Sequence, residues 1–208
     1  MTHATIRIIL EEHAALASML KSLLLLVEQH RREQSAPDFA ALRAMLFYID
    51  EFPEKVHHTK ESELLFPKMR ERGAALAVLD RLDAEHAQSH RAVLELEHDL
   101  LALEMMADAA DADARRVAFE AKMHGYVTSY LEHMRLEEVE MLPLAERVLG
   151  AGDWAALDAA FMKNRDPLTH REGDDAFRPL FKRILTTLPA PLGLGPAMEA
   201  LDISYKRG

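Results

Sequence analysis

Apolar side chains recur at spacings of three and four residues through four long segments, and this period is that of an amphipathic α-helix. The first segment covers about residues 5–33 and carries Ile6, Ile9, Leu16 and Leu20 on one face. The other three cover about residues 39–67, 74–106 and 114–149. Four amphipathic helices of similar length with short loops predict an all-α protein, an up-down-up-down four-helix bundle.

Helix-breaking residues separate the four segments. The stretch 34–37 contains a proline, and Asp38 directly after it is a suitable N-cap for the second helix. Residues 71–73 and 108–113 form the next two breaks, and Gly150 ends the fourth helix. The pattern therefore predicts where each helix of the bundle begins and ends.

The last part of the chain, residues 150–208, differs from the predicted bundle at residues 1–149. Two stretches, 153–162 and 174–188, have the pattern of short helices, whereas the prolines of 189–196 require an extended chain. This part is apolar enough to pack on the bundle. We therefore expect a C-terminal extension and not a second domain.

The composition excludes several classes of function. The chain contains no cysteine, which rules out disulfides, thiolate metal sites and cysteine nucleophiles. Its formal net charge of −10, without a long basic run, argues against nucleic acid or an anionic membrane as a partner. The N-terminus lacks a signal-peptide pattern, and the longest apolar run, residues 23–27, is too short to cross a bilayer. We expect a soluble, cytoplasmic protein, and the sequence leaves its oligomeric state open.

Seven polar side chains stand where the apolar stripes call for core residues. All four predicted helices contribute to this set, which comprises His13, His57, Glu61, His86, His90, His133 and Glu137. On three of the helices they form pairs at positions i and i+4, which lie on one face, one turn apart. Their distances from the predicted loops are similar, so we expect the seven side chains to form one layer across the bundle.

Such a layer needs a compensating charge, because a buried carboxylate or imidazole without a partner is costly. A shared metal cation compensates all seven groups at once. The spacing His-x-x-x-Glu-x-x-x-x-x-Pro occurs twice, starting at His57 and at His133. Two related helices that each supply an imidazole and a carboxylate suggest two metal ions bridged by carboxylates. Iron, manganese, zinc or mixed metals would all accept these ligands.

The segment from His57 to Pro67, His-His-Thr-Lys-Glu-Ser-Glu-Leu-Leu-Phe-Pro, resembles the signature of hemerythrin-like HHE cation-binding domains. So do three further stretches: Glu12-His13, Glu85-His86 with His90, and residues 133–138. The resemblance covers about residues 1–149, which is the whole of the predicted bundle.

The resemblance implies a non-haem di-iron centre. On the family pattern, one iron would be held by His86, His90 and His133. The other would be held by His13 and His57, with Glu61 and Glu137 bridging the two ions. The two-histidine iron would keep an open position for O₂, NO or a peroxide. Invertebrate oxygen carriers of the family usually have Asp one position beyond Glu137, and this difference argues against reversible O₂ carriage.

Two functions are compatible with this centre. The first is a protein that binds or senses a small diatomic ligand or peroxide. The alternative is a di-iron enzyme that detoxifies NO or peroxide or repairs iron centres. The bacterial repair proteins of this kind commonly carry an additional N-terminal segment with a cysteine, which this chain lacks. Metal storage fits less well, because a two-ion site with no visible channel is a poor store.

Four neighbouring residues receive lesser roles in this interpretation. His58 points about a quarter turn away from His57, so we expect it at the surface or hydrogen-bonded to a ligand. Glu138 is assigned to a solvated face. Tyr130 lies on the inner face, where it either belongs to the core or donates to a metal-bound oxygen. Pro53 must bend the second helix one turn before His57.

Overall fold

The computed structural model describes residues 3–73, 76–163, 166, 168 and 169. Every regular element among them is helical, which confirms the all-α class. In chain order the elements are α1 (Ala4–Glu33), α2 (Phe39–Ile49), η1 (Asp50–His57), α3 (His58–Lys60), η2 (Glu61–Leu65), α4 (Phe66–Glu71), α5 (Leu76–Met105), α6 (Ala112–Leu136), η3 (Glu137–Met141), α7 (Leu142–Val148) and α8 (Ala151–Phe161). The predicted helix at 174–188 and the extended stretch at 189–196 lie outside the described residues.

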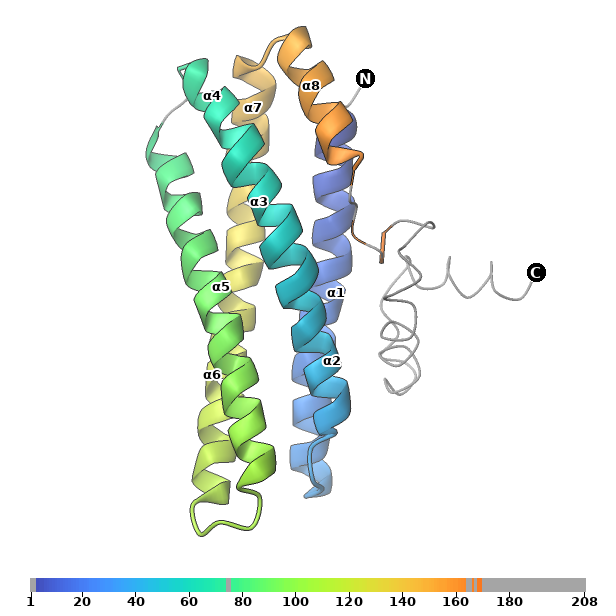
Figure 1. Cartoon of the computed structure of the whole chain (residues 1–208), viewed down its shortest axis with the longest axis vertical. Coiled ribbons are helices and arrows are strands. Elements are labelled where there is room, and N and C mark those ends of the chain that lie inside the picture. The colour runs from blue at the N-terminus through green and yellow to red at the C-terminus, as the bar shows by residue number, and fades with distance from the viewer. Residues whose placement is uncertain (1–2, 74–75, 164–165, 167, 170–208) are drawn as a thin grey trace, which may run out of the picture.

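Figure 1 shows long helical rods that lie side by side. The rods are α1, the continuous run from α2 to α4, α5, and the continuous run from α6 to α7. Helix α8 packs against α1 at the end where α4 and α7 finish. None of the described helices is long and apolar enough to span a membrane.

The breaks between the first rods occur where the sequence predicts them. The Asp38 side chain caps α2, because its Oδ1 accepts a hydrogen bond of 2.9 Å from the backbone N–H of Ala41. Gln34 ends α1 in the left-handed region, with φ +50°. Gly73, with φ +75°, follows α4 and needs the conformational freedom of glycine. Local side-chain chemistry therefore sets the lengths of the first two rods.

The second and fourth rods contain π-helical segments, which have about one more residue per turn than an α-helix. In η2 the backbone N–H of Phe66 donates to the carbonyl of Glu61, five residues back, and Leu142 and Glu137 form the same bond in η3. A proline follows in each case, and its missing N–H removes the next α-helical bond. Pro53 lies inside η1, where it likewise has no N–H to donate. The repeated sequence spacing thus appears as a repeated π-helical turn.

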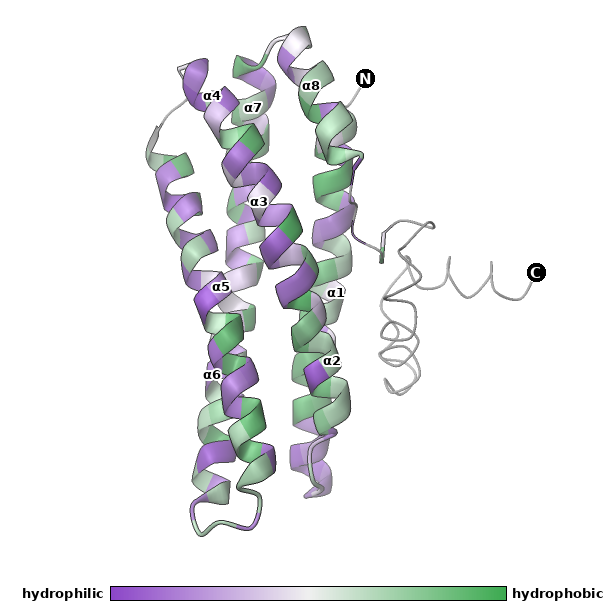
Figure 2. Ribbon diagram, viewed as in Figure 1, coloured by the Kyte–Doolittle hydropathy of each residue, from purple (hydrophilic) through white to green (hydrophobic). Residues whose placement is uncertain are grey.

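Two apolar clusters fill the interior at opposite ends of the rods. The α2 cluster includes Leu20, Leu46 and Leu100, and the α8 cluster includes Ile9 and Met141. Where the two clusters meet, every rod carries at least one buried histidine, and buried glutamates accompany it on the first, second and fourth rods. Figure 2 shows hydrophilic and hydrophobic residues alternating along the whole length of the rods. The polar layer therefore crosses the whole molecule.

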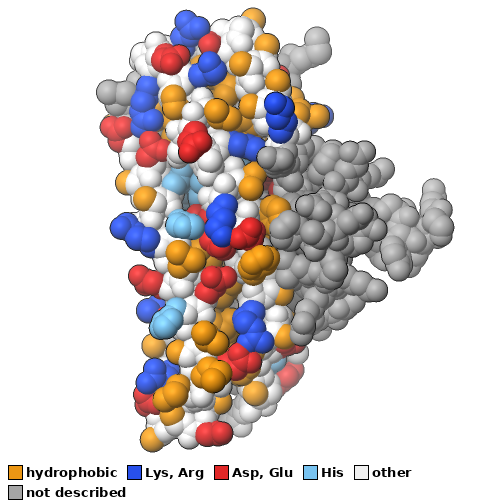
Figure 3. Space-filling model, in the orientation of Figure 1, with side chains coloured by type: hydrophobic (Ala, Val, Ile, Leu, Met, Phe, Trp, Pro, Cys, Tyr) orange, Lys and Arg blue, Asp and Glu red, His pale blue; other side chains and the backbone are white. Residues whose placement is uncertain are grey.

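Helix α8 covers one end of the rods, in agreement with the helix predicted at 153–162. Its Trp154, Leu157 and Phe161 side chains are buried in the α8 cluster. Asp158 accepts hydrogen bonds from the backbone N–H and the hydroxyl of Thr5, at 2.8 and 2.7 Å, at the start of α1. On the face shown in Figure 3, cationic and anionic side chains are interspersed.

Candidate metal centre

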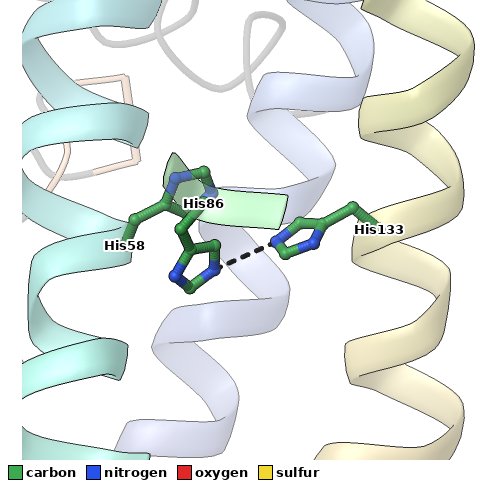
Figure 4. Close-up of side chains that lie close together, drawn as sticks. All are labelled: His58, His86 and His133. Atoms are coloured by element: carbon green, nitrogen blue, oxygen red, sulfur yellow. Dashed lines mark hydrogen bonds between the residues drawn. The ribbon is translucent and has the colours of Figure 1, made fainter. Parts of the chain in front are cut away.

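Two groups of buried polar side chains make up the layer. His58, His86 and His133 form the three-histidine group, and His13, His57, Glu61 and Glu137 form the mixed group. Within each group, ligand atoms from all members lie within 4.8 Å of one another. Figure 4 shows the three histidines converging from different rods. Both groups therefore have the composition and the closeness of a metal site.

The structure brings six of the seven predicted residues together and leaves out His90. The His90 side chain is 43% exposed, and its Nδ1 lies 3.6 Å from Asp50 Oδ1. The buried side chains of α5 alternate at spacings of three and four, as Leu79, Leu82 and His86 illustrate. That alternation continues the inner face of α5 at position 89 and leaves position 90 at the edge of that face. His90 is therefore a member of neither buried group in the described part of the chain, in contrast to the prediction from the i, i+4 spacing.

His58 occupies the place that the sequence interpretation gave to His90. Its ring stacks on that of His86 at 3.9 Å between centroids and lies 5.3 Å from His133. The π-helical segment η1 ends at His57 and α3 begins at His58, so the regular 100° turn between neighbours does not apply across this junction. Adjacent histidines can therefore face two different groups. His58 is buried beside these two histidines, so the expectation of a surface position was wrong.

In all five imidazoles, Nδ1 is held by an oxygen from an outer residue, which leaves Nε2 toward the interior. The acceptors are Glu138 for His13 (2.9 Å), Glu12 for His57 (2.7 Å), Glu54 for His58 (3.0 Å), Ser62 for His86 (2.8 Å) and Glu85 for His133 (2.9 Å). Ser62 in turn donates to Asp83 at 2.7 Å, so its oxygen accepts the Nδ1–H of His86. Metal-binding histidines are oriented in this way in proteins.

These outer residues were not predicted as part of the site, although the sequence carries a partial signal. Glu12 and Glu85 each precede a histidine of the layer, yet each one supports a histidine on another rod. Glu54 lies four residues before His58, which is helical spacing for contact. Glu138 was assigned to a solvated face, but it accepts a hydrogen bond from His13. The supports therefore fix the rods relative to one another.

The inner atoms of the mixed group lack partners. His13 Nε2, His57 Nε2, both carboxylate oxygens of Glu61 and Oε2 of Glu137 are buried without a hydrogen bond among the described residues. Buried polar atoms in proteins are almost always paired, because each unpaired one costs on the order of 1–3 kcal/mol. Lone pairs from imidazoles and carboxylates that converge without donors suit a cation. The residues present therefore fit a metal site.

The two carboxylates influence each other strongly. Burial raises the pKa of Glu61 well above its ordinary value, and the charge of Glu137 raises it further. Burial acts on Glu137 in the same direction, but His133 and two further imidazoles outweigh it and hold the pKa of Glu137 well below its usual range. Two carboxylates this close cannot both be charged without added positive charge. A metal ion would supply that charge.

The two buried phenols of Tyr126 and Tyr130 lie beside the three-histidine group. The Tyr130 hydroxyl donates to His58 Nε2 at 2.8 Å, so it reaches the atom that would bind a metal. The Tyr126 hydroxyl donates to Glu54 Oε1 at 3.0 Å, and Ser89 donates to the same oxygen at 2.5 Å. Burial raises the pKa of Glu54 to about 7. Tyr130 is therefore a contact of the site as well as a core residue.

The sequence matches the hemerythrin HHE cation-binding domain over residues 4–145. A search of curated proteins finds no significant match. The matched range runs from the start of α1 into α7, and it contains every residue of both groups. Because the match covers most of the chain, and because the buried groups fit a cation, this chain belongs to the hemerythrin HHE cation-binding domain family.

Proposed function

We propose that the layer holds two iron ions, one at the three-histidine group and one at the mixed group. The observation that carries this proposal is the position of Glu137 between the groups. Its Oε1 lies 3.2 Å from His133 Nε2, and its Oε2 lies 3.1 Å from His13 Nε2. One carboxylate thus presents one oxygen to each group, which is what a bridging ligand requires.

Glu61 supports the same arrangement from the second rod. Its Oε2 lies 3.5 Å from His57 Nε2 and 3.6 Å from His86 Nε2, which belong to different groups. In this proposal the four rods are the up-down-up-down bundle expected for the family, and His58 replaces His90 as the third imidazole. Manganese or zinc would fit the same ligands, so the choice of iron follows the family and not the geometry.

We infer that the site binds a small molecule, and that O₂, NO or peroxide is the ligand. The mixed group offers two imidazoles where the other group offers three, so its ion has one protein ligand fewer. When bound, the iron pair supplies an open coordination position and can exchange electrons with such a molecule. The chain itself fixes the imidazoles through their Nδ1 atoms and excludes bulk water with the apolar clusters. A binding or sensing role follows most directly.

A second candidate function is an enzyme that consumes NO or peroxide. It is favoured by Glu54, which accepts hydrogen bonds from Tyr126 and from His58 Nδ1 and can hold a proton next to the three-histidine group. Reactions of NO and peroxide take up protons, whereas simple binding does not need such a residue. Turnover therefore distinguishes the two candidates.

The proposal is tested by loading the protein anaerobically with Fe(II) and mixing it with NO, O₂ or H₂O₂ in a stopped-flow spectrometer. We expect two irons per chain and one NO per pair of irons. Repeated consumption of NO or peroxide would identify the enzyme. Binding of two NO molecules per pair, or of none, would contradict the open position at the mixed group.

A further inference from the structure

A hollow of about 430 Å³ lies between α5 and α6, on the side of the three-histidine group. Its outer part is lined by small residues, including Ala92 on α5 and Gly125 and Ser129 on α6. Gly125 and Ser129 are exposed, whereas Tyr130 and His133 at the inner end are buried. The hollow therefore leads from the surface toward the polar layer.

Gly125 keeps this hollow open. It lies within α6, where glycine is less favourable than alanine. A Cβ atom at position 125 would meet no atom within 4 Å, so close packing does not demand glycine there. Its backbone is ordinary helix, without a positive φ. What a larger side chain would change at this position is the open space beside it.

The inner end of the hollow is one layer of side chains away from the ligand atoms. His133 lines the hollow and is itself a member of the three-histidine group. Tyr130 lines it as well, and its hydroxyl donates to His58 Nε2. Ser89 and Tyr126 complete this end and hold Glu54, the acceptor of His58 Nδ1. The hollow thus ends at residues that touch the candidate metal centre.

The charges around the hollow do not favour an anion. Its lining includes two cationic residues, Arg81 and Lys122, and the three carboxylates of Glu85, Glu95 and Glu132. Arg81 pairs with Glu85 at 2.7 Å, and Lys122 pairs with Asp99 at 2.6 Å. An anion therefore finds no free cationic group among them, and an uncharged molecule meets no electrostatic barrier.

We propose that this hollow is the port through which small uncharged molecules reach the metal centre, with Gly125 as the residue that keeps it open. This inference rests on the proposed function, because the molecule that enters is the proposed ligand of the metal centre. A molecule that enters passes between α5 and α6, reaches the layer beside Tyr130 and His133, and from there passes Glu137 to the open position at the mixed group. The family match and the ligand set do not imply this route, which follows from the hollow and its walls.

The port is tested without iron chemistry by NMR of the protein loaded with zinc, a diamagnetic ion. Dissolved O₂ speeds the relaxation of nearby protons. We expect the ring protons of Tyr130 to relax several-fold faster than those of Tyr48, which is equally buried but does not line the hollow. Gly125→Leu should reduce the effect at Tyr130 to the level of Tyr48, and Gly125→Ala should reduce it partly.

Gly152→Leu is the matched control, because Gly152 is also an exposed helical glycine with no atom within 4 Å of an added Cβ. In the iron-loaded protein, Gly125→Leu should slow NO binding at least tenfold without changing the final amount bound, and Gly152→Leu should not. A Tyr130 signal unaffected by Gly125→Leu would overturn the port. A wild-type protein that loads iron but binds no NO would instead overturn the proposed function, and the NMR result would still decide the port.

Discussion

The α2 cluster and the polar layer lie on the same rods, but one buries apolar side chains and the other buries polar ones. In the α2 cluster, residues such as Leu20, Leu46 and Leu100 are completely buried among apolar neighbours. In the layer, Glu61 and Glu137 are just as completely buried, yet carboxylate oxygens of both lack hydrogen bonds among the described residues. On the second and fourth rods the backbone differs as well, because η1, η2 and η3 lie at the layer, whereas α2 is a regular α-helix.

This difference separates the part that stabilises the fold from the part that carries its chemistry. Burial of a leucine side chain contributes about 1.5–3 kcal/mol, whereas an unpaired buried carboxylate opposes folding. Functional sites in proteins commonly have a stability cost of this kind. The π-helical turns lie at the layer, where they change which side chains face inward. We therefore expect the effect of a substitution on stability to depend on bound metal in the polar layer and to be independent of metal in the α2 cluster.

The largest expected effect comes from truncating one residue in the α2 cluster. Leu46→Ala should lower the free energy of unfolding by about 2–5 kcal/mol, with or without metal, because it leaves a cavity among packed side chains. Glu61→Gln should leave the stability of the metal-free protein nearly unchanged, because burial and Glu137 raise the pKa of Glu61 and already favour its neutral form there, and it should destabilise only the metal-loaded form. Urea unfolding of both forms measures this. If Leu46→Ala and Glu61→Gln lowered the free energy of unfolding of the metal-free protein equally, the distinction between the α2 cluster and the polar layer would fail.

The rods and most of the polar layer could be predicted from the sequence. The three-and-four spacing of apolar residues predicts the rods, and polar residues within those stripes, such as His13 and Glu137, predict the layer. Six of the seven proposed ligands follow from that pattern. It fails at His90 because the i, i+4 rule treats residues 86 and 90 as one face, whereas the packing of α5 alternates between three and four. It fails at His58 because the rule assumes an α-helix, and η1 is π-helical.

The roles of the outer carboxylates could not be predicted, because each one depends on the relative position of two rods. Glu12 illustrates this: it lies on α1, accepts from His57 on the second rod and accepts the backbone N–H of Asp166 at 3.2 Å. No spacing along the chain encodes such contacts. The contact of Tyr130 with His58 depends on rod packing in the same way.

A smaller effect is expected at Asp166, a buried carboxyl that borders the α2 cluster. Burial raises its pKa to about 7, although Tyr48 donates a hydrogen bond to it. An acid whose pKa is higher in the folded state binds its proton more tightly there. The resulting stability is therefore present at low pH and is lost as the pH rises from about 4 to about 7. Each unit of pKa corresponds to roughly 1.4 kcal/mol.

Asp166→Asn removes this titration while keeping an oxygen that can accept from Tyr48. The stability of the variant relative to the wild type should therefore increase from pH 5 to pH 8, by on the order of 1–3 kcal/mol. Chemical unfolding of both metal-free proteins across this range measures the difference. A difference that stays constant with pH would show that the buried carboxyl does not titrate there.

The central claim is that the layer binds two metal ions through seven residues that include His58 and exclude His90. The most direct measurement is the metal content per chain of the wild type, His58→Ala and His90→Ala after anaerobic loading with Fe(II) and removal of free metal. We predict two ions in the wild type and in His90→Ala, and fewer than two in His58→Ala. Loss of metal from His90→Ala while His58→Ala retains two ions would contradict the account.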